Sequence, residues 1–280
     1  MIFKKTTSEQ ILELREVQGF PMLVYPLLEQ TGMVKHCFTT RQGGVSEGSF
    51  ESLNLSFTRG DKKEAVEENF RRVAKAMGTE YENFVFTDQT HTTNVKRVGK
   101  EDAGKGLTRE RGYTDIDGLI TNESGIVLST FYADCVPLYF IDPVHRAIGL
   151  SHSGWRGTVR RMGKVTLEAM KAEFGTRSED VICAIGPSIC QSCYEVSEDV
   201  AVEFKQEFPG KEEKILMDKG NGKYQLDLWR ANELILLEAG VKPEHLAVTN
   251  ICTCCNDKLL FSHRASQGKR GNLGAFLRKR

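Results

Sequence analysis

The chain has 280 residues, with 38 basic and 38 acidic side chains and a formal net charge of +0 at pH 7. This length allows one large domain or two small ones, and we predict a single domain over residues 1–280 because no clear linker divides the chain. The balanced charge argues against a nucleic-acid or acidic-lipid partner held by a positive field. We therefore expect a small-molecule ligand.

The cysteine content and the apolar pattern restrict the compartment. Eight cysteines are too few for a disulfide scaffold, and no run of 18 apolar residues predicts a membrane-spanning helix. The apolar stretch over residues 19–28 is interrupted by two prolines and preceded by acidic residues, unlike a signal peptide. We expect a cytoplasmic protein with thiol cysteines and no membrane partner. In that setting, Cys beside His indicates metal binding or nucleophilic chemistry.

The hydrophobic pattern predicts mostly strands, with helices between them. In chain order, strands are expected first, and then a helix with a capping arrangement at 61–64, an apolar face from Val66 to Met77 and an end at Gly78. The strands ahead of this helix are expected over 22–28 and 33–39. After it, strands are expected over 84–87, 95–98, 117–121, 126–132, 136–141, 147–152, 181–185 and 246–249. Further helices are expected over 158–174, 197–208 and 227–239. Strands outnumber helices by more than two to one, which predicts an α+β layered domain and not a simple βαβ repeat.

One predicted hairpin brings a cysteine and a histidine together. Pro143 suits the second position of a turn over residues 142–145, and apolar strands flank that turn. If Asp142 faces His145, Cys135 faces His152, and facing side chains lie roughly 4.5–5.5 Å apart at Cβ. The pair could bind one metal ion or exchange a proton. The structural alternative is a small buried cysteine and a hydrogen-bonded core histidine.

Two further segments add candidate residues. His152 leads directly into a corner containing Trp155 and Arg156, where helix N–H groups could take an anion; core packing is the alternative for Trp155. The polar cluster after the strand over 84–87 contains one histidine, His91. One Cys and two His with an open fourth position suit Zn²⁺, and Cu²⁺ suits the same donors.

Several segments together resemble one family, the laccase-domain proteins, which were first described as multicopper polyphenol oxidases and are now regarded as purine nucleoside phosphorylases. The matching pieces include residues 39–46, 115–118, 133–137, 152–157, 186–189, 193–196, 252–253 and 261–264, together with Gln89 and His91. They follow the family's order over nearly the whole chain. One departure is Thr92, because the family usually has glycine there.

The resemblance implies a fold, a ligand set and a reaction. It implies a single four-layer α/β/β/α sandwich with mixed sheets, metal ligands at His91, Cys135 and His152, and a pocket arginine at Arg41. The implied activity is phosphorolysis of adenosine, inosine and guanosine, accompanied by adenosine deamination and methylthioadenosine cleavage. Arg41 would then hold phosphate, and a bound ion would polarise the purine.

Other assignments stay open from the sequence. Asp115 and Asp117 could position the base or ribose, or could cap a turn before Gly118. The purine nucleoside preferred, the metal loaded and the oligomeric state are not specified by the sequence. The basic residues 269–270 and 278–280 are expected to form a solvated end and not a nucleic-acid arm.

Two other enzyme classes remain open for the same residues, and the other cysteines allow one non-catalytic role. Cys135 and His152 could form a cysteine hydrolase pair, and the older family label suggests copper-dependent phenol oxidation. Six histidines are few for a multicopper centre. A structural zinc clip from Cys190, Cys193 and the group Cys252, Cys254 and Cys255 is a further hypothesis. Cys190 and Cys193 have C-x-x-C spacing, whereas we expect the run over 252–255 to lack the two-residue gap of a zinc ribbon.

Overall fold

Two six-stranded sheets form the centre of the computed structural model, which describes residues 1–280. In sheet order, the first contains β1 (Glu13–Val17), β2 (Phe20–Val24), β3 (Val34–Thr39), β15 (Leu273–Lys279), β7 (Val127–Tyr132) and β4 (Phe84–Phe86). The second contains β14 (Leu246–Val248), β10 (Ile182–Ile185), β8 (Val136–Asp142), β9 (Ala147–Ser153), β6 (Gly118–Thr121) and β5 (Val95–Arg97). Both sheets are mixed, because parallel pairs occur at β4–β7, β10–β14 and β5–β6.

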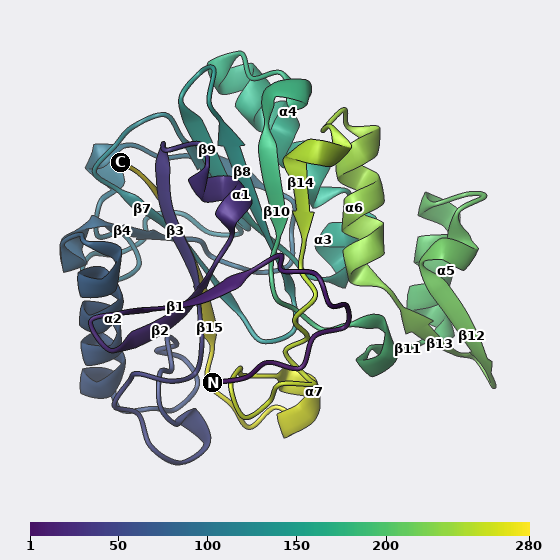
Figure 1. Cartoon of the computed structure of the whole chain (residues 1–280), viewed down its shortest axis with the longest axis horizontal. Helices are drawn as coiled ribbons and strands as arrows, with labels where there is room; N and C mark the ends of the chain where they lie inside the picture. Colours follow the sequence, from purple (N-terminus) through teal and green to yellow (C-terminus); the bar gives the residue numbers. More distant parts are fainter.

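Helices cover the outer faces of the two sheets (Figure 1). The first sheet packs against α2 (Lys63–Met77) through an aromatic core that includes Phe70 and Phe276. The second packs against α3 (Trp155–Val159), α4 (Met162–Phe174) and α6 (Leu228–Glu238). Between the sheets, Phe38 and Leu128 share a buried core with Tyr139 and Leu150. This order of layers confirms the α+β class and the four-layer α/β/β/α arrangement.

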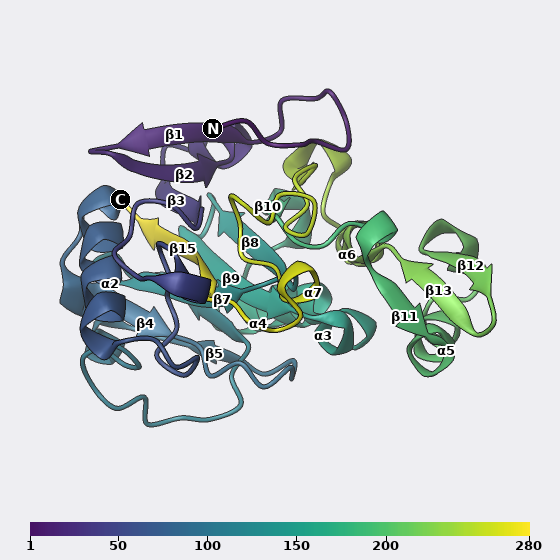
Figure 2. The same ribbon diagram turned by 90° about the horizontal axis from the view of Figure 1, so that it is seen from below.

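A small unit projects from one side of the sandwich (Figure 2). It consists of a three-stranded sheet in the order β11 (Glu195–Ser197), β13 (Lys223–Leu226) and β12 (Leu216–Gly220), with α5 (Glu198–Glu207) beside it. Two one-turn helices complete the structure, α1 (Pro26–Glu29) and α7 (His263–Ser266). None of the helices is both long enough and apolar enough to cross a bilayer.

The predicted helices are mostly confirmed, with two corrections. The apolar face from Val66 to Met77 is buried, and Gly78 ends α2 in the left-handed region, but Lys62 is the N-cap and no side chain caps it. The capping arrangement at 61–64 was therefore wrong, because the Asp61 carboxylate accepts hydrogen bonds from Ser46 and Asn54 instead. The helix over 158–174 is also wrong as one element: it begins at Trp155 and breaks at Arg161, whose φ is +60°.

The strand predictions failed at both ends of the chain. Residues 26–28 belong to α1, and β1 was missed. The expected solvated basic end is wrong, because residues 273–279 form β15 between β3 and β7, in the middle of the first sheet. The guanidinium groups of Arg278 and Arg280 donate to the carbonyls of Met77 and Val34, at 3.1 and 2.9 Å. Charged ends of a strand can therefore lie over backbone carbonyls and not in solvent.

The hairpin register also differs from the prediction. The turn spans Asp142 to Ala147, so Pro137 and not Cys135 faces His152. The Asp142 carboxylate lengthens the turn by accepting from the amides of Val144 and His145, at 2.9 and 3.0 Å. This register is displaced by two residues from the predicted one, and side chains two apart share a face of the sheet. Cys135, just before β8, therefore stays on the side of His152.

Candidate metal centre

Three side chains from separate parts of the chain meet at one point. His91 lies in the loop after β4, Cys135 immediately precedes β8, and His152 lies in β9. Their ligand atoms, two imidazole nitrogens and one sulfur, all lie within 4.8 Å of one another. The two imidazole rings stand edge to face, with centroids 5.1 Å apart. The structure thus brings together the three residues proposed as metal ligands.

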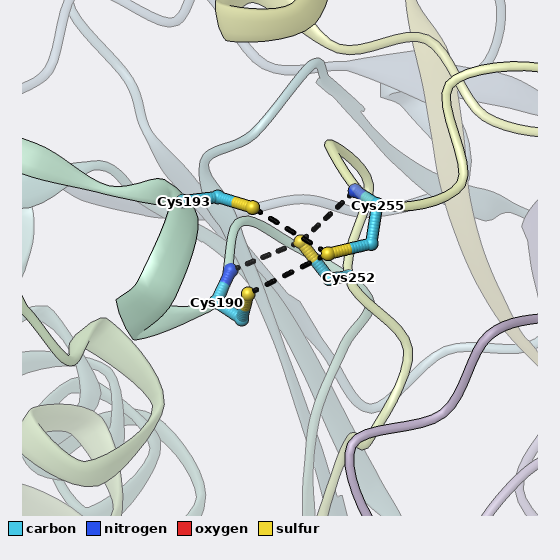
Figure 3. A group of neighbouring side chains, drawn as sticks. All are labelled: Cys190, Cys193, Cys252 and Cys255. Carbon is cyan, nitrogen blue, oxygen red and sulfur yellow. Dashed lines mark hydrogen bonds between the residues drawn. The ribbon is translucent and has the colours of Figure 1, made fainter.

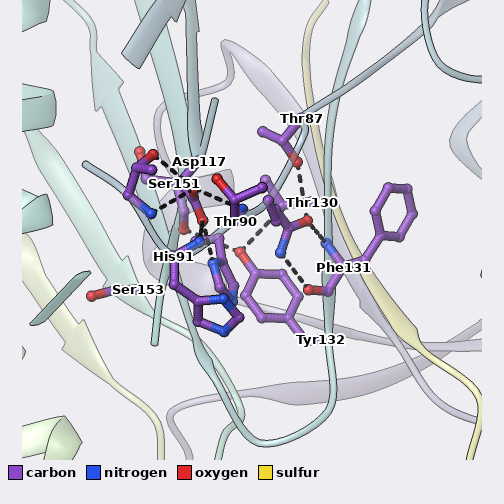
Figure 4. A network of polar contacts seen from close by, with 12 residues as sticks. Thr87, Thr90, His91, Asp117, Thr130, Phe131, Tyr132, Ser151 and Ser153 are labelled. Carbon is purple, nitrogen blue, oxygen red and sulfur yellow. Dashed lines mark hydrogen bonds and ion pairs between the residues drawn. The ribbon is translucent and has the colours of Figure 1, made fainter. Parts of the chain in front are cut away.

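Asp117 fixes the orientation of His152 and the path of the loop that carries His91. Figure 4 shows Asp117 beside Thr90 and His91 of that loop. Its fully buried carboxylate accepts a 2.7 Å hydrogen bond from His152 Nδ1, which leaves Nε2 free for a ligand. The same carboxylate accepts the backbone amides of Thr90, His91 and Thr92, and the hydroxyl of Thr92. A carboxylate behind a ligand histidine sets its tautomer and ring plane, which is the usual support of a metal-binding imidazole.

The loop conformation shows how this chain manages without a glycine at position 92. His91 has φ +66°, in the left-handed region, whereas the φ of Thr92 is not positive. Both the amide and the hydroxyl of Thr92 donate to Asp117, at 2.9 Å each. The threonine therefore adds a bond to the buried carboxylate at the position where the resemblance led us to expect glycine.

The position of Cys135 depends on the residue before it. Asp134 has φ +90° and is buried, and its carboxylate accepts the Thr253 hydroxyl and the Arg264 amide, each at 2.7 Å. Its carbonyl accepts the Ile189 amide at 3.0 Å. These bonds hold a backbone conformation that non-glycine residues rarely adopt, and they aim Cys135 at the two histidines.

Gly154 allows the three ligands to approach. A Cβ atom at this position would lie 2.8 Å from Cδ2 of His91 and 3.2 Å from the sulfur of Cys135. Both distances are shorter than ordinary van der Waals contact. The glycine is therefore required by the side chains around it and not by its own backbone, whose φ is −69°.

The electrostatics of the group favour a thiolate. Burial raises the pKa of Cys135, but the adjacent His152 and His91 outweigh burial and lower the pKa to about 6. Burial lowers the pKa of His152, but Cys135 and Asp117 outweigh burial and raise the pKa to about 9. A thiolate and two imidazoles are donors that Zn²⁺ and Cu²⁺ accept, and a bound cation would replace a proton between them. These residues fit a metal ion.

A cavity of about 410 Å³ opens beside the three ligands. The three ligands line this cavity together with the aromatic side chains of Phe57, Phe86, Phe131 and Tyr132. Three guanidinium groups contribute positive charge, from Arg59, Arg111 and Arg270. Arg111 is paired with Asp88, whereas no carboxylate lies within 4.0 Å of Arg59 or Arg270. The cavity thus combines the three candidate metal ligands, aromatic side chains and two guanidinium groups without a carboxylate partner.

Comparison with known proteins places this geometry in a family. Residues 35–279 match the family model described as multi-copper polyphenol oxidoreductase laccase. The chain belongs to this family. Relatives include the purine nucleoside phosphorylase YlmD of Bacillus subtilis, 37% identical with 86% of each chain covered. A purine nucleoside phosphorylase of Bacteroides thetaiotaomicron is 36% identical, with 90% of this chain and 94% of the relative covered.

Solved structures of family members confirm the fold. The crystal structure of YlmD from Geobacillus stearothermophilus matches with a TM-score of 0.90 and 34% identity, and it covers 96% of this chain and 99% of that one. A protein of Bacillus licheniformis called YfiH also matches with a TM-score of 0.90, at 32% identity over 95% of this chain and 99% of that one. The agreement extends over both sheets.

The expected phosphate residue, Arg41, lies outside the cavity that contains the three ligands. It lines a neighbouring cavity of about 140 Å³, and its guanidinium donates to the carbonyls of Glu51 and Asp257 at 2.6 and 2.9 Å. Arg270 lines both cavities. Arg59, Arg111 and Arg270 were missed as site residues. Their only sequence signal is positive charge, and Arg270 lies in the basic run that was expected to be solvated.

The other predicted substrate residues are not oriented to this cavity either. Trp155 packs against the core beneath α3, and the Arg156 guanidinium lies 4.3 Å from the centroid of the Trp155 ring. Neither residue lines the cavity. Substrate contact by Asp117 is also corrected, because its buried oxygens are already occupied by hydrogen bonds from protein donors. Asp117 is a positioning residue.

Substitution of Asp117 tests this positioning role. In Asp117→Asn an amide group replaces an oxygen that accepts from Thr90 and Thr92, so donors face donors, and we expect metal affinity to fall about 10–100-fold. Metal competition with a chromophoric chelator measures the change. Asp115→Asn is the control, because Asp115 is exposed two residues away. Equal affinities of the two variants would contradict the role.

Substitution of Gly154 tests the close approach of the ligands. We expect Gly154→Ala to weaken metal binding at least about tenfold, since the new methyl group collides with His91 and Cys135. In Gly157→Ala, three residues along, the nearest atom would be 3.6 Å away, which is an ordinary contact. That control should bind metal as the unchanged protein does. If Gly154→Ala also keeps full affinity, the three side chains do not share an ion.

Proposed function

We propose that the chain is a purine nucleoside phosphorylase that cleaves adenosine, inosine and guanosine with phosphate in the cavity beside His91, Cys135 and His152. The names of its relatives support an enzyme of this kind. The cavity offers what the reaction needs from a protein: a place for an anion, a flat apolar surface and a cation site beside them. Deamination of adenosine and cleavage of methylthioadenosine are proposed as further activities of the same cavity.

The observation that carries the proposal is the state of Arg270. Arg270 is 8% exposed and has no carboxylate partner; its Nη1 donates to the Gly271 carbonyl and to the Asn272 side chain, and its Nε has no hydrogen-bond partner. Burial, followed by the nearby Arg59, lowers the pKa of Arg270 to about 10. A buried unpaired cation is costly, and an anion that bonds to it removes the cost. We therefore assign phosphate to Arg270 and Arg59.

The reaction has two requirements, a site for phosphate and stabilisation of the leaving purine. Phosphate oxygen attacks the ribose carbon, the bond to the purine breaks, and its electron pair passes to the purine, which needs a proton or a cation there. We propose Zn²⁺ at the three ligands, with Cu²⁺ as the second choice for the same donors; either ion supplies Lewis acidity toward the leaving base. Phe131 and Phe57 supply apolar surface that can pack against the purine.

The lowered pKa of Cys135 supports one competing function, a cysteine hydrolase. The thiolate beside His152 would act without a metal. Copper-dependent phenol oxidation has less support, because no second cluster of histidines accompanies His91 and His152. Activity that persists without metal, or product that appears without phosphate, would favour the hydrolase; activity lost only when oxygen is excluded would favour the oxidase.

The first test uses the ligand residues. We expect Cys135→Ala and His91→Ala to abolish release of hypoxanthine from inosine and phosphate. The circular dichroism spectrum should stay unchanged, because His91 is exposed and Cys135 is only half-buried. Release must also require phosphate. Undiminished product from Cys135→Ala would refute the assignment of Cys135.

The second test separates the two arginine assignments. We expect Arg270→Gln to raise the KM for phosphate about tenfold or more, since a charge-assisted pair is lost, while the KM for inosine changes less. Arg41→Gln should leave both constants within about twofold. The opposite pattern would return phosphate binding to Arg41, as the family resemblance suggests.

A further inference from the structure

Four cysteines form a second group that the proposed function does not use (Figure 3). Cys190 and Cys193 flank a short turn after β10, and Cys252 and Cys255 lie in the turn that follows β14. All eight cysteines of the chain are free thiols in the structure. In Figure 3 the four sulfur atoms turn toward a common centre. The group is separate from His91, Cys135 and His152.

The spacing within this group corrects the sequence interpretation. Cys252 and Cys255 are separated by two residues, so they form a second C-x-x-C pair. The adjacent Cys254 obscured this spacing, and Cys254 is not part of the group. Two such pairs, far apart in sequence, are the ligand pattern of four-cysteine zinc sites.

The sulfur positions suit one tetrahedral ion. The four sulfur atoms lie within 4.8 Å of one another, with 3.9 Å between Cys190 and Cys255 and 3.4 Å between Cys193 and Cys255. Zn–S bonds of about 2.3 Å at tetrahedral angles place sulfur atoms about 3.8 Å apart. Only small side-chain movements are needed to reach that arrangement.

Backbone amides around the group are directed at sulfur. The amide of Cys190 lies 3.2 Å from Cys252 Sγ, and the amide of Cys255 lies 3.4 Å from the same atom. The contact from the Cys255 amide to Cys252 Sγ joins the last residue of this C-x-x-C pair to the first. Amide donors stabilise a thiolate and orient it, as hydrogen bonds to the ligands of a metal site do.

We propose that Cys190, Cys193, Cys252 and Cys255 bind one Zn²⁺ ion as a structural site. Four protein ligands leave no open position for water or substrate, so this site holds the fold and takes no part in the reaction. Cys190 and Cys252 are buried, which suits a closed site.

The ion would connect segments that support the candidate metal centre. The first cysteine pair leads into β11 and the projecting unit, and the second precedes the loop to α7. Between Cys252 and Cys255 lies Thr253, whose hydroxyl donates to Asp134, the neighbour of Cys135. The Arg264 guanidinium joins the same segments by donating to the carbonyls of Cys193 and Glu195, at 3.2 and 2.8 Å.

Metal counting on the full chain tests the proposal. Protein purified with reductant and Zn²⁺, then freed of loosely bound metal, should hold two ions per chain, and Cys135→Ala should hold one. Cys190→Ser with Cys255→Ser should lose one ion, whereas Cys254→Ser, in the same turn, should lose none. Loss of the ion should also lower the melting temperature, because metal binding is coupled to folding.

A second measurement does not depend on the double variant, which lacks two of the ligands that would hold the fold. Cys135→Ala keeps all four cysteines, and Co²⁺ bound to it should show the strong sulfur-to-metal absorption of four thiolates. A Cys135→Ala chain that binds neither Zn²⁺ nor Co²⁺ tightly would overturn the proposal. So would two disulfides within the group, detected by mass under non-reducing conditions. Neither outcome depends on phosphorolysis, so this proposal and the proposed function can fail separately.

Discussion

The candidate metal centre depends on one buried carboxylate. Asp117 has no contact with solvent, so its charge must be compensated by protein donors, and it is: the His152 ring, three consecutive amides and one hydroxyl supply them. Because these donors come from both β9 and the loop at 90–92, the carboxylate fixes the distance between the two histidine ligands. Burial raises the pKa of the Asp117 carboxyl, but His152 and the amides of Thr92 and Thr90 outweigh burial and lower the pKa below its usual value, so the carboxyl is held ionised.

The other ligand is positioned by a different part of the chain. Cys135 follows a residue in the left-handed region, and that conformation is supported from outside the hairpin, by Thr253 and Arg264. Thr253 lies in sequence between Cys252 and Cys255 of the four-cysteine group. The structure therefore contains two groups of candidate metal ligands that include sulfur. One has three residues beside a cavity, as in an open site, and the other has four cysteines, as in a closed structural site. The enclosed group supports the segment on which the open group depends.

Charge in this protein is local. The whole chain is neutral, yet three arginines line one cavity, and only Arg111 has an acidic partner there. A neutral total argues only against a long-range field, and it gives no information about a cluster of cations at short range. Arg270 precedes β15 and reaches the cavity because β15 lies in the middle of the first sheet.

The sequence by itself determined most helices and central strands, because apolar periodicity and glycine stops are local signals, and it identified His91, Cys135 and His152. The meeting of Cys135 and His152 was predicted from a register that was wrong by two residues, and it survived because that displacement preserves the face of a strand, whereas His91 was added from its polar segment and the family resemblance. Tertiary structure alone decided the place of β15, whose basic residues resemble a solvated end but bond to distant carbonyls. It also decided the role of Asp117, the arginines of the cavity and the convergence of two cysteine pairs about sixty residues apart. These features depend on contacts between segments far apart in the chain, and such contacts leave no spacing that can be read along one sequence.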